Sequence, residues 1–125
     1  MNAEMRQMQE NLYMRVKILE DNQVISGKVA DYTRHAVDML LEEKPDVSQE
    51  KAEMFFTHLA MAGMRAEQGI EENPMDAAIL ESAALDPVYE KAVDFRDRML
   101  QETDIEFPQT EKDFLSVHLC NLFNE

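Results

Sequence analysis

The sequence predicts an all-α protein, and three observations support this fold class. Apolar residues recur at steps of three and four along most of the chain, which is the period of a helix with one buried face. Helix-forming residues dominate, while Gly and Pro number only three and four. No stretch alternates between apolar and polar residues for long enough to form a strand. A chain of 125 residues, 45% of them hydrophobic, has the size and composition of one folded domain.

The first two predicted helices are separated by a break at residues 21–27, where Asp, Asn, Ser and Gly gather. The first carries an apolar stripe of Met5, Met8, Leu12, Val16 and Leu19. We expect it either to dock loosely on the domain or to pair with a second copy. The second carries a stripe of Ile25, Val29, Tyr32, Ala36 and Leu40. This helix should end at Lys44, because a residue that precedes proline is disfavoured in the helical conformation.

A third predicted helix is the most apolar of the chain. Ser48 is placed to cap its start, and the helix should run to about Glu67. Gly69 follows at the position where a left-handed residue commonly closes a helix. Apolar residues cover so much of its circumference that we expect this helix at the centre of a bundle. Its His58 and Arg65 are two turns apart and should lie near the same face.

Three further helices are predicted in the second half of the chain. Asn73 and Asp86 each precede a proline, which is a signal for a helix start. Residues 103–108 form a short extended linker. Thr110 is then expected to cap the last helix, with Glu111 in its first turn, where a carboxylate complements the helix dipole.

The composition excludes several classes of function. A net charge of −14 with scattered Lys and Arg argues against direct binding to nucleic acid, which requires a basic patch. No run approaches the roughly 18 apolar residues of a membrane span, and the N-terminus lacks the pattern of a signal peptide. Cys120 is the only cysteine and cannot form an internal disulfide. We therefore expect a cytoplasmic protein.

Two histidines, His58 and His118, lie in apolar helical settings and are the candidate functional residues. A metal site needs three or four ligands at suitable spacing, and none is present, so we expect neither a metal nor a cofactor. Ser116 and Cys120 flank His118 two residues away on either side, which points them away from it on a helix. His35 is interpreted as a surface histidine among carboxylates. An enzyme is therefore not expected.

The order of these motifs resembles the phosphotransferase-system regulation domain (PRD) of bacterial sugar-operon regulators. The resemblance covers residues 16–122 and rests on two His-Leu pairs. The pair His58-Leu59 is followed by Arg65 and then by Asn73. The segment Pro108-Gln109-Thr110-Glu111 leads into a helix that carries His118-Leu119.

This resemblance implies a five-helix bundle over residues 16–125, extended by a helical segment at residues 1–15, with both histidines near a shared surface. It implies that the histidines accept phosphoryl groups from the histidine phosphocarrier protein or from enzyme II components. Arg65, Asn73 and Glu111 would contact or support the phosphate. The protein would then be a homodimeric stand-alone domain that regulates transcription through dimerisation or through a separate regulator.

Two alternatives remain open from the sequence. In the first, the chain is an interaction or dimerisation module without phosphorylation, in which both imidazoles are buried and hydrogen-bonded and their loss destabilises the fold. In the second, it is an enzyme or a metalloprotein, which predicts a bound metal or a deep polar pocket.

Overall fold

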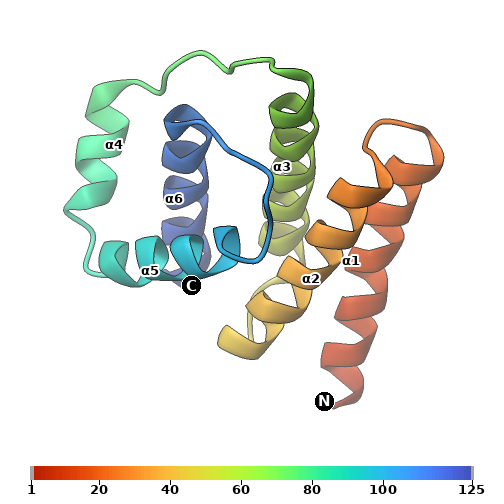
Figure 1. The fold of residues 1–125 in the computed structure, drawn as a ribbon. Coiled ribbons are helices and arrows are strands. Elements are labelled where there is room, and N and C mark those ends of the chain that lie inside the picture. The colour runs from red at the N-terminus through yellow and green to blue at the C-terminus, as the bar shows by residue number, and fades with distance from the viewer. Residues whose placement is uncertain (1, 125) are drawn as a thin grey trace.

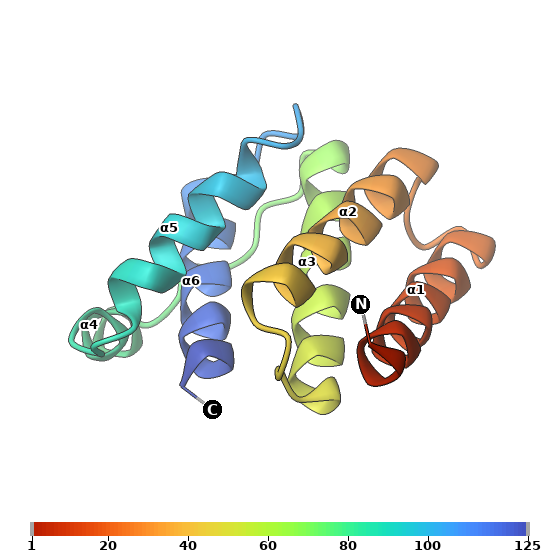
Figure 2. The same cartoon turned by 90° about the horizontal axis from the view of Figure 1, so that it is seen from below.

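The computed structural model describes residues 2–124, and within this range it contains six α-helices and no strand, which confirms the all-α fold class. The helices are α1 (Ala3–Asp21), α2 (Gly27–Glu43), α3 (Gln49–Gln68), α4 (Ala77–Ala84), α5 (Tyr89–Leu100) and α6 (Gln109–Phe123). Two of them organise the bundle (Figure 1): α3 packs against α1, α2 and α6, while α6 packs against α3, α4 and α5. Figure 2 shows α1 on one side of α3 and both α5 and α6 on the other, while α2 crosses in front of α3.

The helix α1 is part of the core. It runs unbroken through residue 15 and buries Leu12 and Val16 against α2 and α3. The helix α2 begins after Ser26, whose side chain accepts a hydrogen bond from the backbone N–H of Val29, and ends at Glu43 with Lys44 as its cap, as the following proline predicts.

The central position of α3 is confirmed. Ser48 accepts a hydrogen bond from the backbone N–H of Lys51 at its start, and Gly69 closes it with a φ of 70°. Gly63 lies where α3 meets α2, and a Cβ atom at this position would lie 3.0 Å from Cγ1 of Val29. The missing side chain therefore allows the two helices to approach closely.

Two predicted caps are wrong. Asn73 does not start a helix: residues 70–76 have no regular structure, and α4 begins after Asp76, whose carboxylate accepts a hydrogen bond from the N–H of Ala78. Asp76 is an equally good cap, and an uninterrupted run of helix formers follows it. Thr110 does not cap α6, because the helix already begins after Pro108. Proline needs no partner for an N–H group and can hold the cap position itself.

The predicted start of α5 is displaced by two residues. Asp86 accepts a hydrogen bond from the N–H of Val88 in a turn that precedes the helix, and α5 itself begins at Tyr89. The helix α5 buries Ala92, Phe95 and Met99, with Val88 partly buried just before it.

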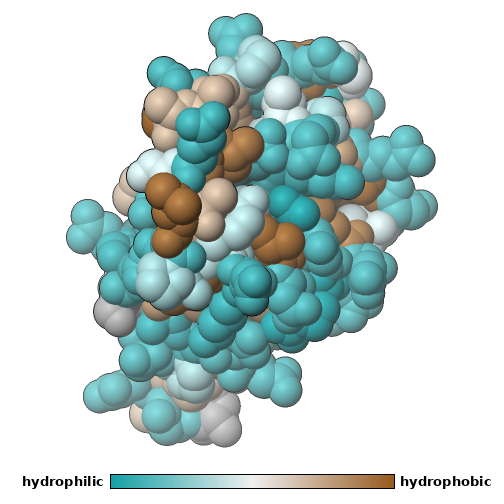
Figure 3. All heavy atoms as spheres, turned by 90° about the vertical axis from the view of Figure 1, so that its left-hand side faces the viewer, coloured by the Kyte–Doolittle hydropathy of each residue, from teal (hydrophilic) through white to brown (hydrophobic). Residues whose placement is uncertain are grey.

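The helix α4 is the most loosely packed of the six. It buries none of its residues and packs on α6. Ile79 remains 51% exposed, and Leu85, directly after the helix, is 86% exposed. Figure 3 looks onto the side of the molecule where α4 lies and shows hydrophobic groups set in a hydrophilic surface. Among residues 2–124, no helix is both long and apolar enough to cross a membrane.

Candidate functional site

The packing of α3 against α6 brings the two candidate histidines together. The ring centroids of His58 and His118 are 4.7 Å apart, with their planes inclined by 41°. Both side chains are half-buried, and the ring of Phe114 lies 5.8 Å from that of His58. Residues separated by sixty positions thus form one imidazole pair at the junction of the two central helices.

A buried ion pair lies beside His58. Nε of Arg65 donates to Oε2 of Glu111 at 2.7 Å, and Nη2 of Arg65 donates to Oε1 at 3.1 Å. Glu111 is fully buried, and Arg65 also lies 3.4 Å from a carboxylate oxygen of Glu72. The hydrogen bonds to Glu111 raise the pKa of Arg65 above its ordinary value despite burial. Such a two-pronged contact fixes the orientation of both side chains.

His58 has no comparable partner. Its Nε2 atom is buried and makes no hydrogen bond within residues 2–124. The nearest carboxylate oxygen, Oε1 of Glu111, lies 3.7 Å away, which is too far for a hydrogen bond. A buried polar atom without a partner costs about 1–3 kcal/mol, so this nitrogen is held in an unfavourable setting by the packing around it.

Both imidazoles are neutral at neutral pH. Burial, reinforced by the neighbouring His118, lowers the pKa of His58 to about 4, although the negative charge of Glu111 opposes the shift. Burial also lowers the pKa of His118 below its ordinary value. The contact between His58 and Glu111 is therefore not an ion pair at neutral pH. Each neutral ring presents one unprotonated nitrogen with a free lone pair.

A groove of about 300 Å³ opens beside His118 between the two helices, and we call it the α3–α6 groove. Its lining consists of Lys51, Met54, Phe55, His118, Asn121 and Leu122. Phe55 and Leu122 are only 1% exposed, whereas Met54 is 60% exposed. The groove thus has an apolar floor and an accessible methionine, and it reaches the imidazole of His118.

The other predicted site residues fall in different places. Glu111 and Arg65 adjoin His58, as described, but Asn73 is exposed in the segment 70–76, and no interaction among residues 2–124 joins it to either histidine. Glu72, one residue earlier, contacts Arg65 instead. Glu72 was missed because it lies beyond the end of α3, where helical spacing no longer indicates which side chains meet.

The third histidine, His35, lies outside this site. His35 is exposed on α2, with Nε2 lying 3.6 Å from Glu102, in accord with its interpretation as a surface residue. Within residues 2–124, no three His, Cys, Asp or Glu side chains are grouped so that they could hold a metal ion.

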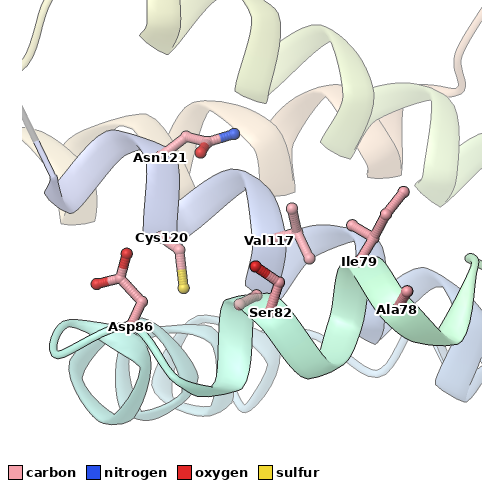
Figure 4. A pocket seen from close by; sticks show the side chains of 8 residues that line it. Ala78, Ile79, Ser82, Asp86, Val117, Cys120 and Asn121 are labelled. Atoms are coloured by element: carbon pink, nitrogen blue, oxygen red, sulfur yellow. The ribbon is translucent and has the colours of Figure 1, made fainter.

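A second cavity, of about 390 Å³, lies between α4 and α6. Figure 4 shows Ser82 and Asp86 on the α4 side, with Val117 and Cys120 facing them from α6. Burial, with a smaller contribution from the charge of Asp86, raises the pKa of Cys120 above its ordinary value. Cys120 is therefore a protonated thiol at neutral pH and a poor nucleophile.

No family model, curated protein or solved structure matches this chain. The features that bear on function are those of the site itself: two imidazoles 4.7 Å apart, a buried Arg–Glu pair next to one of them, and an open groove next to the other. The resemblance to the PRD remains a prediction from the two His-Leu motifs.

Proposed function

We propose that this protein is a PRD-like regulatory module of the sugar phosphotransferase system in which His58 and His118 are phosphoryl acceptors. The observation that carries the proposal is the pair of imidazoles 4.7 Å apart, both kept neutral by burial. Only the unprotonated ring nitrogen of a neutral imidazole can attack phosphorus. A histidine with an ordinary pKa would be partly protonated near neutral pH, and the lowered pKa values of His58 and His118 favour the neutral ring.

The orphaned nitrogen of His58 favours an acceptor role over a purely structural one. A structural histidine in a core is expected to have its ring nitrogens hydrogen-bonded, and Nε2 of His58 is not. Buried polar atoms without partners are uncommon; within residues 2–124, Oγ1 of Thr110 is the other one, and a binding or reactive role is one explanation for such an atom. This departs from the hydrogen-bonded imidazoles that an interaction module with structural histidines requires.

Phosphorylation of His58 would disturb the adjacent ion pair. A phosphoryl group adds about −1.5 to −2 charges, and Glu111 lies 3.7 Å from Nε2 of the ring. Two like charges about 4 Å apart near a protein surface repel by about 4 kcal/mol, which is comparable to the roughly 3–5 kcal/mol that the loss of one partner from a buried ion pair costs. The phosphoryl group would therefore compete with Glu111 and Glu72 for Arg65, and this rearrangement is the proposed signal.

The proposed partners follow from the same chemistry. The histidine phosphocarrier protein or an enzyme II component would supply the phosphoryl group in the cytoplasm, so this protein would need no catalytic residues of its own. The signal would then pass to a homodimer interface or to a separate transcription regulator. The charge of −14 disfavours direct contact with DNA or RNA and favours a donor with a basic face.

The test is intact-mass analysis after incubation with phosphoenolpyruvate, enzyme I and the phosphocarrier. The wild-type protein should gain phosphate, His35→Ala should gain it equally, and the double variant His58→Ala/His118→Ala should gain none. Phosphate uptake by the double variant, or none by the wild type while a control acceptor is labelled, would refute the proposal.

A second candidate function is a helical interaction module, which the exposed apolar residues of α4 favour. Ile79 on α4 is 51% exposed, and Leu85 directly after this helix is 86% exposed. A wild-type protein that accepts no phosphate from an active relay would make this the leading function.

A further inference from the structure

We infer that the α3–α6 groove is the docking surface for the phosphoryl donor, and that it receives a phosphorylated protein surface in which an apolar side chain lies next to the phosphoryl group. This inference rests on the proposed function and adds to it the place and the chemistry of the partner. It further implies that His118 meets the donor before His58 does.

Access distinguishes the two histidines. The ring of His118 lines the groove, whereas His58 is not among the groove's lining residues. The Nε2 atom of His58 is instead buried close to Glu111. A donor that approaches from solvent along the groove thus reaches His118 directly.

The lining of the groove selects an apolar side chain. Phe55 and Leu122 form a floor that is almost entirely shielded from solvent, while Met54 stands 60% exposed at the groove. Methionine is flexible and polarisable, and it adapts its shape to an incoming side chain. An apolar side chain of the donor would therefore be covered by Met54 above the floor that Phe55 and Leu122 provide.

The charge of the groove suits the phosphoryl group of the donor. Among residues 2–124, Lys51 is the charged side chain that lines the groove, and its charge is positive in a chain whose net charge is −14. Its Nζ atom lies 3.4 Å from the backbone oxygen of Asn121, which also lines the groove. The ammonium group of Lys51 thus gives an anionic phosphoryl group a favourable contact at this groove, although the protein as a whole is acidic.

Phosphoryl transfer to His118 exchanges one P–N bond for another. The lone pair of the unprotonated ring nitrogen of His118 forms a new P–N bond as the bond between phosphorus and the donor's nitrogen breaks. The electron pair of the broken bond stays on the donor nitrogen; the donor takes up one proton, and His118 releases the proton of its other ring nitrogen, so that protons balance. Phosphoramidate undergoes the same exchange with ammonia as the leaving group, but it is small enough to need no docking surface.

This difference between donors provides the test. Met54→Gln replaces the apolar side chain at the groove by an uncharged polar one of similar size, while Met14→Gln makes the same change on α1, where the side chain is similarly exposed at 58%. Initial rates of phosphate gain are measured by intact mass for both variants and the wild type, with the phosphocarrier and with phosphoramidate in turn. Met54→Gln should slow the transfer from the phosphocarrier by at least about tenfold, as for an interface hot spot, and leave the phosphoramidate rate within about twofold of wild type. Met14→Gln should match the wild type with both donors.

These rates distinguish a failure of the docking surface from a failure of the acceptor role. If Met54→Gln accepts phosphate from the phosphocarrier at the wild-type rate, or slows both donors equally, the docking surface is refuted while the acceptor role stands. If the wild type is labelled by phosphoramidate alone, this phosphocarrier does not dock in the groove and the inference fails. If neither donor labels the wild type, the proposed function itself fails.

Discussion

Replacing Arg65 by Met removes the guanidinium that faces the fully buried carboxylate of Glu111 and keeps most of the side-chain volume. Removal of one partner from a buried ion pair costs about 3–5 kcal/mol, because the other charge is left uncompensated. Arg65 is 16% exposed, so some solvent reaches the site, and we expect the lower end of this range, about 3 kcal/mol. A domain of this length has a total stability of roughly 6–19 kcal/mol, and the variant should therefore still fold.

The assay is urea unfolding at pH 7 within a double-mutant cycle that includes Glu111→Gln and the combined variant. The combined variant should be more stable than Arg65→Met alone, since it no longer buries an unpaired charge. A loss below about 1 kcal/mol for Arg65→Met, which is typical of a surface ion pair, would refute the reasoning. Strict additivity of the two single substitutions would refute it as well.

Three further predictions concern stability. The free energy of unfolding should fall as the pH is lowered from 6.5 toward 4, by up to about 3 kcal/mol more in the wild type than in His58→Asn. The reason is that His58 takes up a proton near pH 6.5 in the unfolded chain but only near pH 4 in the folded protein, and parallel pH profiles of the two proteins would contradict this. Gly63→Ala should lower the free energy of unfolding in urea by about 1 kcal/mol despite the better helix propensity of Ala, since the new Cβ lies 3.0 Å from Val29. Adding Val29→Ala should remove the clash, and a stabilised Gly63→Ala variant would be inconsistent with the packing. Tyr32→Phe should lose about 1 kcal/mol by thermal unfolding, because its buried hydroxyl donates to the carbonyl oxygen of Met99 at 2.8 Å, and an unchanged midpoint would argue against that bond.

Local signals predicted the helices well where one signal acted alone. Ser48 and the glycine after α3 each had no competitor nearby, and both serve as predicted. Asn73 competed with Asp76, and Thr110 with the preceding proline, and in both cases the other residue holds the cap position. The sequence supplies the candidates for a cap, but the packing of the whole helix decides among them.

The candidate site could be predicted only in part. Helical spacing alone places His58 and Arg65 near one face of α3. The contact between Arg65 and Glu111 joins residues 46 positions apart and depends on how α3 packs against α6, which periodicity does not specify. The residue pattern therefore indicated Glu111 as a dipole-complementing carboxylate, whereas the structure buries it in an ion pair.

The acceptor role of the two histidines is tested by locating the phosphoryl group on the relay-treated wild-type protein, using electron-transfer fragmentation at near-neutral pH so that P–N bonds survive. We expect phosphate on His58 or His118 that is lost after brief acid treatment. Phosphate on His35 or on a hydroxyl group, or no phosphate while a control acceptor is labelled, would contradict it.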